Sequence, residues 1–234
     1  PGVAAHVAQT WPAQRLPGNA DAAIDKAARW FATDGAAVYQ FHAKFYYLGG
    51  HTEQWDTDPM RPFWNGIATP GSTLYFTIWG SRPGSRYTTA ERDTYIEEHN
   101  TLMRWIERYP DVTAVITLGF PWRSYIEDGR IVLPEELREV FDAPQCILQL
   151  LFPIQLGNLF EYPWPETESA LQECVENIGA DRLIYGTDMP MVARFCTYQQ
   201  TLDQYRRHCD FLTDEERAAI LGDTEARLLG MRGE

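Results

Sequence analysis

The chain has 234 residues, and its 33 Asp and Glu residues outnumber its 20 Lys and Arg residues, which gives a formal net charge of −13 at pH 7. This negative charge repels nucleic acid and anionic membrane surfaces, so the expected partner is a small molecule. No stretch approaches the roughly 18 uncharged apolar residues of a membrane-spanning helix, and no secretion signal opens the chain, which predicts a soluble protein.

A chain of this length can bury one substantial core, and the regular spacing of its elements predicts a single domain over residues 1–234. The oligomeric state is not fixed by the sequence, and a homo-oligomer stays open. The cysteines lack the Cys-x-x-Cys spacing of a zinc or redox site. We expect buried, reduced thiols, which favours a cytoplasmic protein, at four positions: Cys146, Cys174, Cys196 and Cys209.

Short apolar runs alternate with helical patterns along the chain. Strands are predicted at residues 3–8, 36–45, 73–79, 112–118, 146–152 and 181–188. Helices are predicted at residues 20–33, 58–68, 89–109, 134–141, 166–178, 197–209 and 213–221. Because strands separated by helices require parallel crossovers, the sequence predicts an α/β fold with a parallel sheet.

The alternation of side chains within two strands predicts an inner face that carries polar groups. In residues 36–45 one face holds Gln40, His42 and Lys44, and the other face is mostly apolar. In residues 73–79 we expect Leu74, Phe76 and Ile78 to pack under helices, which leaves Tyr75, Thr77 and Trp79 on the opposite face. Polar residues on one side of a buried strand fit a barrel whose lumen holds the functional site.

Loops after the predicted strands supply cationic and aromatic side chains. Residues 80–86 carry Arg82 and Arg86, and residues 119–123 end in Trp122 and Arg123. A guanidinium group at a strand end can hold a substrate carboxylate by paired hydrogen bonds, and aromatic side chains commonly line small-ligand pockets. The alternative is that these residues are solvated surface charges and packing aromatic rings.

The segment Arg182-Leu-Ile-Tyr-Gly-Thr-Asp188-Met-Pro190 is predicted to be a buried strand that presents one carboxylate at its C-terminal end. Parallel α/β folds keep their chemistry at this end of the strands. A helical pattern follows, and then Thr213 with Glu216 three residues later forms a capping box. The chain closes with Ala-Arg-Leu-Leu-Gly, which ends at Gly230.

This order of Gly-Thr-Asp-x-Pro after a strand, a helix, a capped helix and the closing Ala-Arg-Leu-Leu-Gly resembles the C-terminal end of the amidohydrolase superfamily. The similar branch is the amidohydrolase-2 family, which includes aminocarboxymuconate-semialdehyde decarboxylase-like proteins. The resemblance implies a (β/α)8 TIM barrel, with residues 1–234 as its third to eighth βα units and the first one or two units before Pro1. A smaller doubly wound α/β domain is the alternative, and strand order distinguishes the two.

The resemblance also bears on whether the protein binds a divalent metal ion. In metal-dependent members, a His-x-His pair on the first strand, a His that ends the fifth strand and the Asp of the eighth strand hold a divalent ion, and a His on the sixth strand acts in catalysis. Here Asp188 matches the last position, but Thr77 and Thr117 stand where the other two histidines are expected. A zinc or manganese ion bound by Asp188 is therefore a doubtful cofactor, and the cofactor stays unknown.

We expect a hydrolase that acts on a small carboxylated cyclic substrate, a lactone or amide, as metal-free lactonases of the superfamily do. Asp188 would be the general base, and His42 and Lys44 would polarise the carbonyl. Substrate binding is predicted for Tyr75, Trp79, Arg82, Arg86, Trp122 and Arg123. The alternatives are a metal-dependent non-oxidative decarboxylase of the same family and a catalytically inactive binding barrel, which the two Thr replacements suggest.

Each catalytic assignment has a structural alternative. Asp188 could cap the helix that follows it, and His42 could be a core histidine bonded to the backbone. Lys44 could pair with Asp188 or with Asp56. Three further histidines are expected on loops or helix surfaces and receive no role: His51, His99 and His208.

Overall fold

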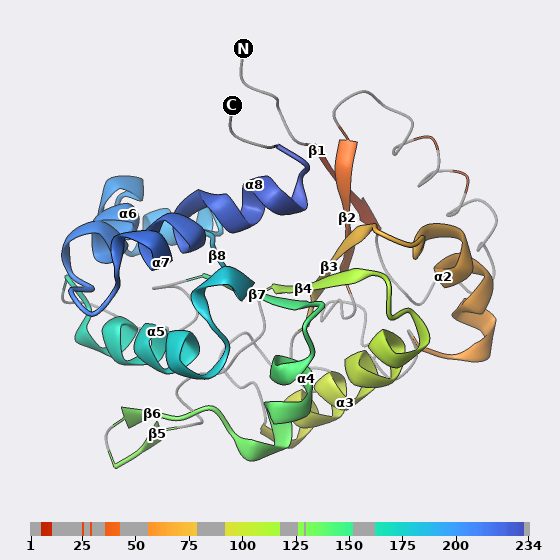
Figure 1. Ribbon diagram of the computed structural model, residues 1–234, viewed down its shortest axis with the longest axis horizontal. Coiled ribbons are helices and arrows are strands. Elements are labelled where there is room, and N and C mark those ends of the chain that lie inside the picture. Colours follow the sequence, from red (N-terminus) through yellow and green to blue (C-terminus); the bar gives the residue numbers. More distant parts are fainter. Residues whose placement is uncertain are drawn as a thin grey trace. The chain divides into compact units, whose positions relative to one another are not determined.

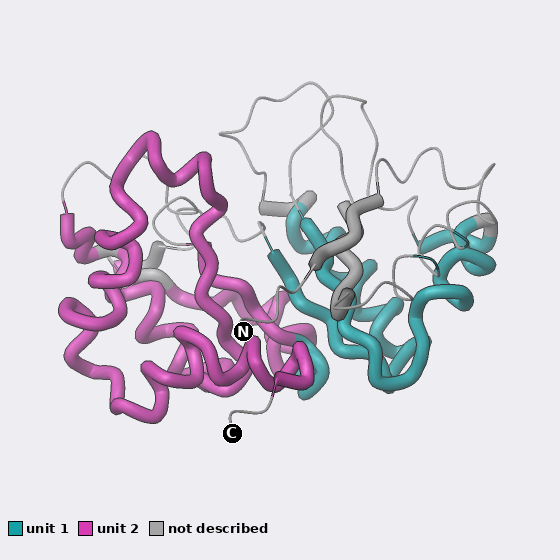
Figure 2. Tube along the Cα trace, turned by 90° about the horizontal axis from the view of Figure 1, so that it is seen from above, with its two compact units in different colours: residues 1–119, 143–146 teal, residues 120–142, 147–234 magenta. Residues whose placement is uncertain are grey.

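The computed structural model describes residues 6–10, 25, 29, 36–42, 56–78, 92–117, 126–128, 130–151 and 162–231. The chain divides into two compact units, which Figure 2 shows in different colours. Unit 1 comprises residues 1–119 and 143–146, and unit 2 comprises residues 120–142 and 147–234. No helix in the described ranges is long and apolar enough to cross a membrane.

Parallel strands form the centre of unit 1 and follow one another in chain order (Figure 1). They are β1 (His6–Thr10), β2 (Ala36–His42), β3 (Thr73–Thr77) and β4 (Thr113–Thr117). Such consecutive pairing is the winding of a barrel, whereas a doubly wound sheet reverses its strand order partway. The structure therefore has the predicted fold class, part of a TIM barrel, and β1 lies slightly later in the chain than predicted.

An aromatic cluster joins β3 to the helices of unit 1. The turn η4 (Asp58–Met60) leads into α2 (Arg61–Ile67), and α3 (Arg92–Arg108) precedes β4. The ring of Phe76 lies 4.7 Å from the Trp105 ring of α3 and 5.9 Å from the Trp64 ring of α2, measured between centroids. The prediction that Phe76 packs under helices is confirmed, and the alternate residues of β3 lie on the other face.

Helix α3 also corrects one prediction, because His99 is fully buried and does not lie at the helix surface. Its Nδ1 donates a hydrogen bond to the carbonyl oxygen of Tyr95 one turn earlier, at 2.9 Å, and the two rings are in contact, with centroids 4.2 Å apart and planes tilted by 40°. Burial lowers the pKa of His99 to about 4, so the imidazole is neutral at pH 7.

Unit 2 contains a second parallel pair, formed by β7 (Cys146–Leu150), of which residues 147–150 belong to this unit, and β8 (Leu183–Tyr185). Before β7 come η6 (Glu135–Leu137) and α4 (Arg138–Asp142), and between the strands come α5 (Pro165–Asn177) and η8 (Ala180–Arg182). Strand β8 is shorter than predicted at both ends, since Asp181 and Arg182 belong to η8 and the strand ends at Tyr185. The Arg182 guanidinium donates hydrogen bonds to the carbonyl oxygens of Ile178 and Phe141.

The C-terminal part of unit 2 is helical. Its elements are η9 (Met191–Arg194), α6 (Tyr198–Arg207), α7 (Asp214–Ala218), the π-helical turn η10 (Ala219–Asp223) and α8 (Thr224–Leu228). The predicted capping box is confirmed, since the Thr213 hydroxyl accepts a hydrogen bond from the Glu216 amide and the Glu216 carboxylate accepts one from the Thr213 amide. The helix continues past the predicted end at residue 221 because the π-helical turn leads into α8.

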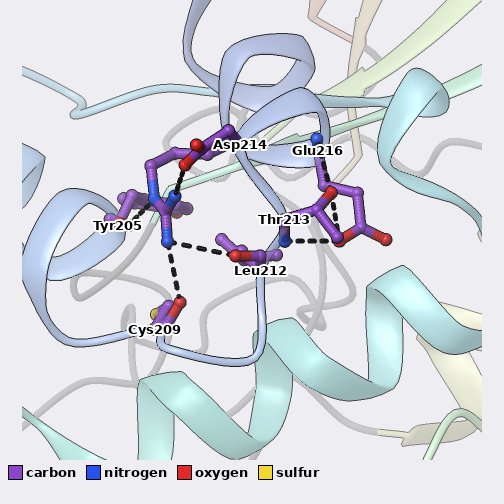
Figure 3. Close-up of polar contacts among 7 residues, drawn as sticks. Tyr205, Cys209, Leu212, Thr213, Asp214 and Glu216 are labelled. Atoms are coloured by element: carbon purple, nitrogen blue, oxygen red, sulfur yellow. Dashed lines mark hydrogen bonds and ion pairs between the residues drawn. The ribbon is translucent and has the colours of Figure 1, made fainter.

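Arg217 joins α7 to the end of α6 through hydrogen bonds to four residues that Figure 3 labels, Tyr205, Cys209, Leu212 and Asp214. Its guanidinium donates hydrogen bonds to the carbonyl oxygens of Tyr205, Cys209 and Leu212, at 2.9, 3.3 and 3.2 Å, and to the Asp214 carboxylate at 2.9 Å. Carbonyl groups near a helix C-terminus lack partners within the helix, and a cation there supplies them. One side chain thus fixes the loop between two helices.

Two smaller findings complete the fold. The short antiparallel pair β5 (Ile126–Glu127) and β6 (Arg130–Ile131) was not predicted, although the sequence between the strands is Asp-Gly, a common hairpin signal. All four cysteines are free, as predicted, and three are buried, while Cys196 is partly exposed.

Candidate active site

Asp188 lies three residues beyond the end of β8, which is a buried strand. The amide of Gly186 still donates to the carbonyl oxygen of Leu150 at 2.9 Å, so the parallel pairing extends one residue past β8. Both Leu183 and Ile184 are almost fully buried. The apolar core thus anchors the strand, and the chain leaves it at the edge where a parallel sheet presents its C-terminal ends.

The backbone of Asp188 adopts a left-handed conformation, with φ of 52°. Asp tolerates this region better than most residues with a side chain, because its short polar group can interact locally. Its carbonyl oxygen accepts hydrogen bonds from the amides of Met191 and Val192, at 2.7 and 3.3 Å. These bonds hold the turn that directs the chain from β8 into η9.

The side chain of Asp188 is partly buried, and this burial raises the pKa of its carboxyl above the ordinary value. The interpretation of Asp188 as a helix cap is wrong: η9 has Pro190 at its N-cap without a side-chain hydrogen bond, and Thr197 caps α6. Among the described residues, the Asp188 carboxylate has no hydrogen-bond or ion-pair partner. A raised pKa and an uncommitted carboxylate are features of a general base.

The two faces of the β7 and β8 pair have different neighbours. Tyr185 lies on the face covered by α6, where its hydroxyl is 2.6 Å from the Thr201 hydroxyl and its ring is 5.3 Å from the Tyr205 ring. Side chains alternate along a strand, so Ile184 and Gly186 belong to the opposite face. We call this opposite face, which leads to Asp188, the inner face.

On the inner face, Gly186 is approached closely by side chains from β7 and the residue after it. A Cβ atom at Gly186 would lie 2.5 Å from Cδ2 of Leu151 and 3.1 Å from Cγ and Cδ of Gln149. The register pairs Gln149 with Ile184, which places both on the same face. Within β7, Gln149 is the one residue that is not buried. Gln149 was not among the predicted site residues, although it is the single polar residue in the run Cys146-Ile-Leu-Gln-Leu-Leu151.

In unit 1, the register aligns the C-terminal ends of three strands. His42 pairs with Thr77, and Thr77 pairs with Thr117. Thr77, Thr117 and Tyr75 are all buried. Tyr75 and Thr77 alternate with the helix-covered Phe76, so they lie on the face of β3 where the sequence analysis expects the barrel lumen.

Of His42, the structure describes only the backbone, in β2. The other predicted site residues lie outside the described residues: Lys44, Trp79, Arg82, Arg86, Trp122 and Arg123. The alternative partner proposed for Lys44, Asp56, forms an ion pair with Arg108, and the Asp56 side chain is 3% exposed.

The described residues do not by themselves fit a divalent metal. They contain no group of three or more His, Cys, Asp or Glu side chains that could hold an ion. Zinc usually takes three protein ligands even at catalytic sites, and in the described part of the chain Asp188 stands without such companions. We derive no step through a metal.

Parallel strands wound in chain order and an acidic residue just past a strand define a protein of the TIM-barrel class. A family described as amidohydrolase, the amidohydrolase-2 family, matches residues 4–231, and the chain belongs to this family. Its members include hydrolases and decarboxylases, so the family is one of enzymes. No curated protein matches the sequence.

Several solved structures share the fold. The chain is similar to 5-carboxyvanillate decarboxylase from Sphingomonas paucimobilis, with a TM-score of 0.60 and 14% identity over 92% of this chain and 65% of that one. It is similar to an amidohydrolase with bound zinc from Burkholderia multivorans, with a TM-score of 0.65 and 16% identity over 93% of this chain and 71% of the other.

A further similar structure is described as a probable 2-pyrone-4,6-dicarboxylic acid hydrolase from Acinetobacter baumannii with citric acid bound. Its TM-score is 0.60 and its identity 14%, over 88% of this chain and 68% of that one. This chain therefore spans about two thirds of the length of the structures that it resembles. At these identities the likeness establishes the fold alone, and it does not identify the substrate.

Proposed function

We propose that this chain is an amidohydrolase that hydrolyses a small carboxylated cyclic substrate, a lactone or a cyclic amide, with Asp188 as general base. The observation that carries the proposal is the Asp188 carboxylate, which is partly buried, has a raised pKa and caps no helix. A base with a pKa closer to the working pH accepts a proton more readily while staying mostly ionised.

In the proposed reaction Asp188 removes a proton from water as the water oxygen bonds to the substrate carbonyl carbon. The ring C–O or C–N bond then breaks, and Asp188 returns the proton to the leaving oxygen or nitrogen. His42 and Lys44 polarise the carbonyl in this scheme. Cationic and aromatic side chains bind the ring and its carboxylates: Tyr75, Trp79, Arg82, Arg86, Trp122 and Arg123.

The similar structure named for 2-pyrone-4,6-dicarboxylic acid supports a carboxylated ring as the substrate class. The net charge of −13 supports a small molecule and not nucleic acid or a membrane surface as the partner. The four free cysteines support a cytoplasmic location. A homo-oligomer is compatible with each of these proposals.

A second candidate is a non-oxidative decarboxylase, and the similarity to 5-carboxyvanillate decarboxylase favours it. A third candidate is an inactive binding barrel, which the Thr residues at the aligned ends of β3 and β4 favour. Turnover of an aromatic acid that is lost on chelation and restored by zinc or manganese would support the decarboxylase. Binding of ring carboxylates without turnover would support the binding barrel.

The test compares the purified chain with Asp188→Asn and with Asp210→Asn, which changes an exposed Asp in the same unit. Lactones, cyclic amides, 2-pyrone-4,6-dicarboxylate and hydroxybenzoates are the substrates. Loss of a general base lowers the rate by about 10²- to 10⁴-fold, so Asp188→Asn should abolish measurable hydrolysis with an unchanged circular dichroism spectrum. Hydrolysis by Asp188→Asn at the rate of Asp210→Asn would refute the proposal.

A further inference from the structure

We propose that Gln149 is a substrate-binding residue of the Asp188 site, whose side-chain amide donates a hydrogen bond to a carbonyl or carboxylate oxygen of the carboxylated ring. The proposal rests on the function proposed above and adds a residue that the sequence analysis did not assign. Its starting observation is the position of Gln149 on the inner face, beside Gly186 and short of the strand end that leads to Asp188.

The side chain of Gln149 lies on the inner face of the β7 and β8 pair. Gln149 pairs in register with Ile184, while Leu150 pairs with Tyr185, whose ring packs against α6. In parallel strands, paired residues point to the same side of the sheet. Gln149 therefore points away from α6 and shares its side with Gly186.

The Cδ atom of Gln149, which bears the amide, lies 3.1 Å from the position of a Cβ at Gly186. Two residues of extended chain span at most about 7 Å, so the Cα atom of Asp188 is within that distance of the Cα atom of Gly186. A single planar ring is of similar size, so one small substrate can reach both the amide and the carboxylate.

The other residues of β7 are buried, and Gln149 alone keeps part of its surface exposed. A partly exposed residue of the strand can be reached by a ligand, whereas its neighbours in β7 are enclosed in the core. A polar group on a rigid strand beside Gly186 is well placed to position a ligand, because the strand fixes its location.

The chemistry of the group fits the substrate class. A carboxamide donates hydrogen bonds through its nitrogen and accepts them through its oxygen, so it can bind a carbonyl or carboxylate oxygen. It carries no charge, and it can therefore bind the substrate without neutralising the carboxylate of Asp188. Gly186 leaves room for this side chain and above all for Leu151, since a Cβ there would lie 3.1 Å from Cδ of Gln149 and 2.5 Å from Cδ2 of Leu151.

The experiment measures binding separately from turnover. Gln149→Met keeps the length of the side chain and removes its hydrogen bonds, and Gln172→Met is the matched control on the surface of α5, where Gln172 contacts Glu176. Both changes are made in the wild-type chain and in Asp188→Asn. The probes are 2-pyrone-4,6-dicarboxylate and 5-carboxyvanillate, and their affinities are measured by calorimetry.

We expect Gln149→Met to weaken binding of the better probe about tenfold in both backgrounds, which is the upper range for one neutral hydrogen bond. Gln149→Glu should weaken it further, because a new carboxylate repels the carboxylated probe, and a purely packing role would not produce this difference. Gln172→Met should bind as wild type does.

The outcomes separate the two proposals. Hydrolysis that survives Asp188→Asn would refute the general base, while a binding loss confined to the Gln149 variants would still support the present inference. Unchanged probe affinity in Gln149→Met and Gln149→Glu, with melting temperatures equal to that of the wild type, would overturn the inference. Failure of the wild-type chain to bind either probe would overturn it as well.

Discussion

Replacement of His99 by Asn should remove a specific part of the pH dependence of stability. His99 is fully buried, and its pKa falls from 6.5 to about 4 because burial disfavours the charged imidazolium. In the unfolded chain the residue takes up a proton below pH 6.5, whereas in the folded chain it does so only below about pH 4. Between these values the unfolded state binds more protons, so the free energy of unfolding decreases as the pH falls.

The size of the effect follows from the shift. One pKa unit corresponds to about 1.36 kcal/mol, so the shift from 6.5 to about 4 corresponds to about 3 kcal/mol in the free energy of unfolding. This contribution is fully present above pH 6.5 and is lost near pH 4. Asn can reproduce the hydrogen bond to the Tyr95 carbonyl without titrating. The raised pKa of Asp188 acts in the opposite direction, but it is common to both proteins and cancels in their difference.

Urea denaturation at half-unit steps from pH 4 to pH 7 measures the effect. His99→Asn should be less stable at pH 7 because it loses the ring contact with Tyr95, and this deficit should shrink by about 3 kcal/mol toward pH 4. The matched control is His208→Asn, which makes the same replacement at a histidine that lies near the surface and is hydrogen-bonded to the Tyr162 hydroxyl. Equal pH slopes for wild type and His99→Asn would refute the reasoning.

Three further predictions concern unit 2. Gly186→Ala should lower the free energy of unfolding, measured by urea denaturation, by about 1–3 kcal/mol because the new Cβ would overlap Leu151. A decrease under about 0.5 kcal/mol would contradict the close approach. Arg217→Met should cost about 2–3 kcal/mol through lost hydrogen bonds to carbonyl groups, whereas Arg207→Met, which removes a surface ion pair, should cost under about 1 kcal/mol. The acidic limb of the kcat/KM profile should have an apparent pKa above that of an ordinary Asp, because the base form of Asp188 is lost as the pH falls; a limb at or below the ordinary value would contradict the burial effect.

The parts of the fold that follow from local rules could be predicted from the sequence. The alternation in residues 73–79 correctly placed Phe76 under helices, because a strand between two layers has only two faces. The spacing of Thr213 and Glu216 correctly marked a helix start, because both partners of a capping box lie within four residues. Such features need no knowledge of distant segments.

The parts that depend on tertiary contacts could not be predicted so well. His99 was expected at the surface because histidine is usually polar, yet it follows Tyr95 by one turn on the buried face of α3. A hydrogen bond to a carbonyl of its own helix makes this burial tolerable. The hydrogen bond from Arg182 to the carbonyl oxygen of Phe141 likewise joins residues far apart in the sequence, and no local pattern predicts it.

The candidate site contains one feature that could be predicted from the sequence and one that could not. The position of Asp188 after Gly-Thr could be predicted, because strand ends in parallel folds are recognisable from an apolar run and its boundary. The role of Gln149 needed the register between β7 and β8, which the sequence does not state. A polar residue within an apolar run can face either the helices or the site, and the run alone does not say which.

Among the residues that the structure describes, the Asp188 carboxylate has no partner, and the turn after β8 gives a structural reason. At the transition from β8 to η9 the backbone carbonyl of Asp188, and not its side chain, accepts the amides of Met191 and Val192. Had the side chain capped η9, its carboxylate would have been stabilised as the anion and its pKa lowered. Because the left-handed backbone at Asp188 forms the turn through the carbonyl, the turn does not require the side chain, which supports the general-base role that we propose for Asp188.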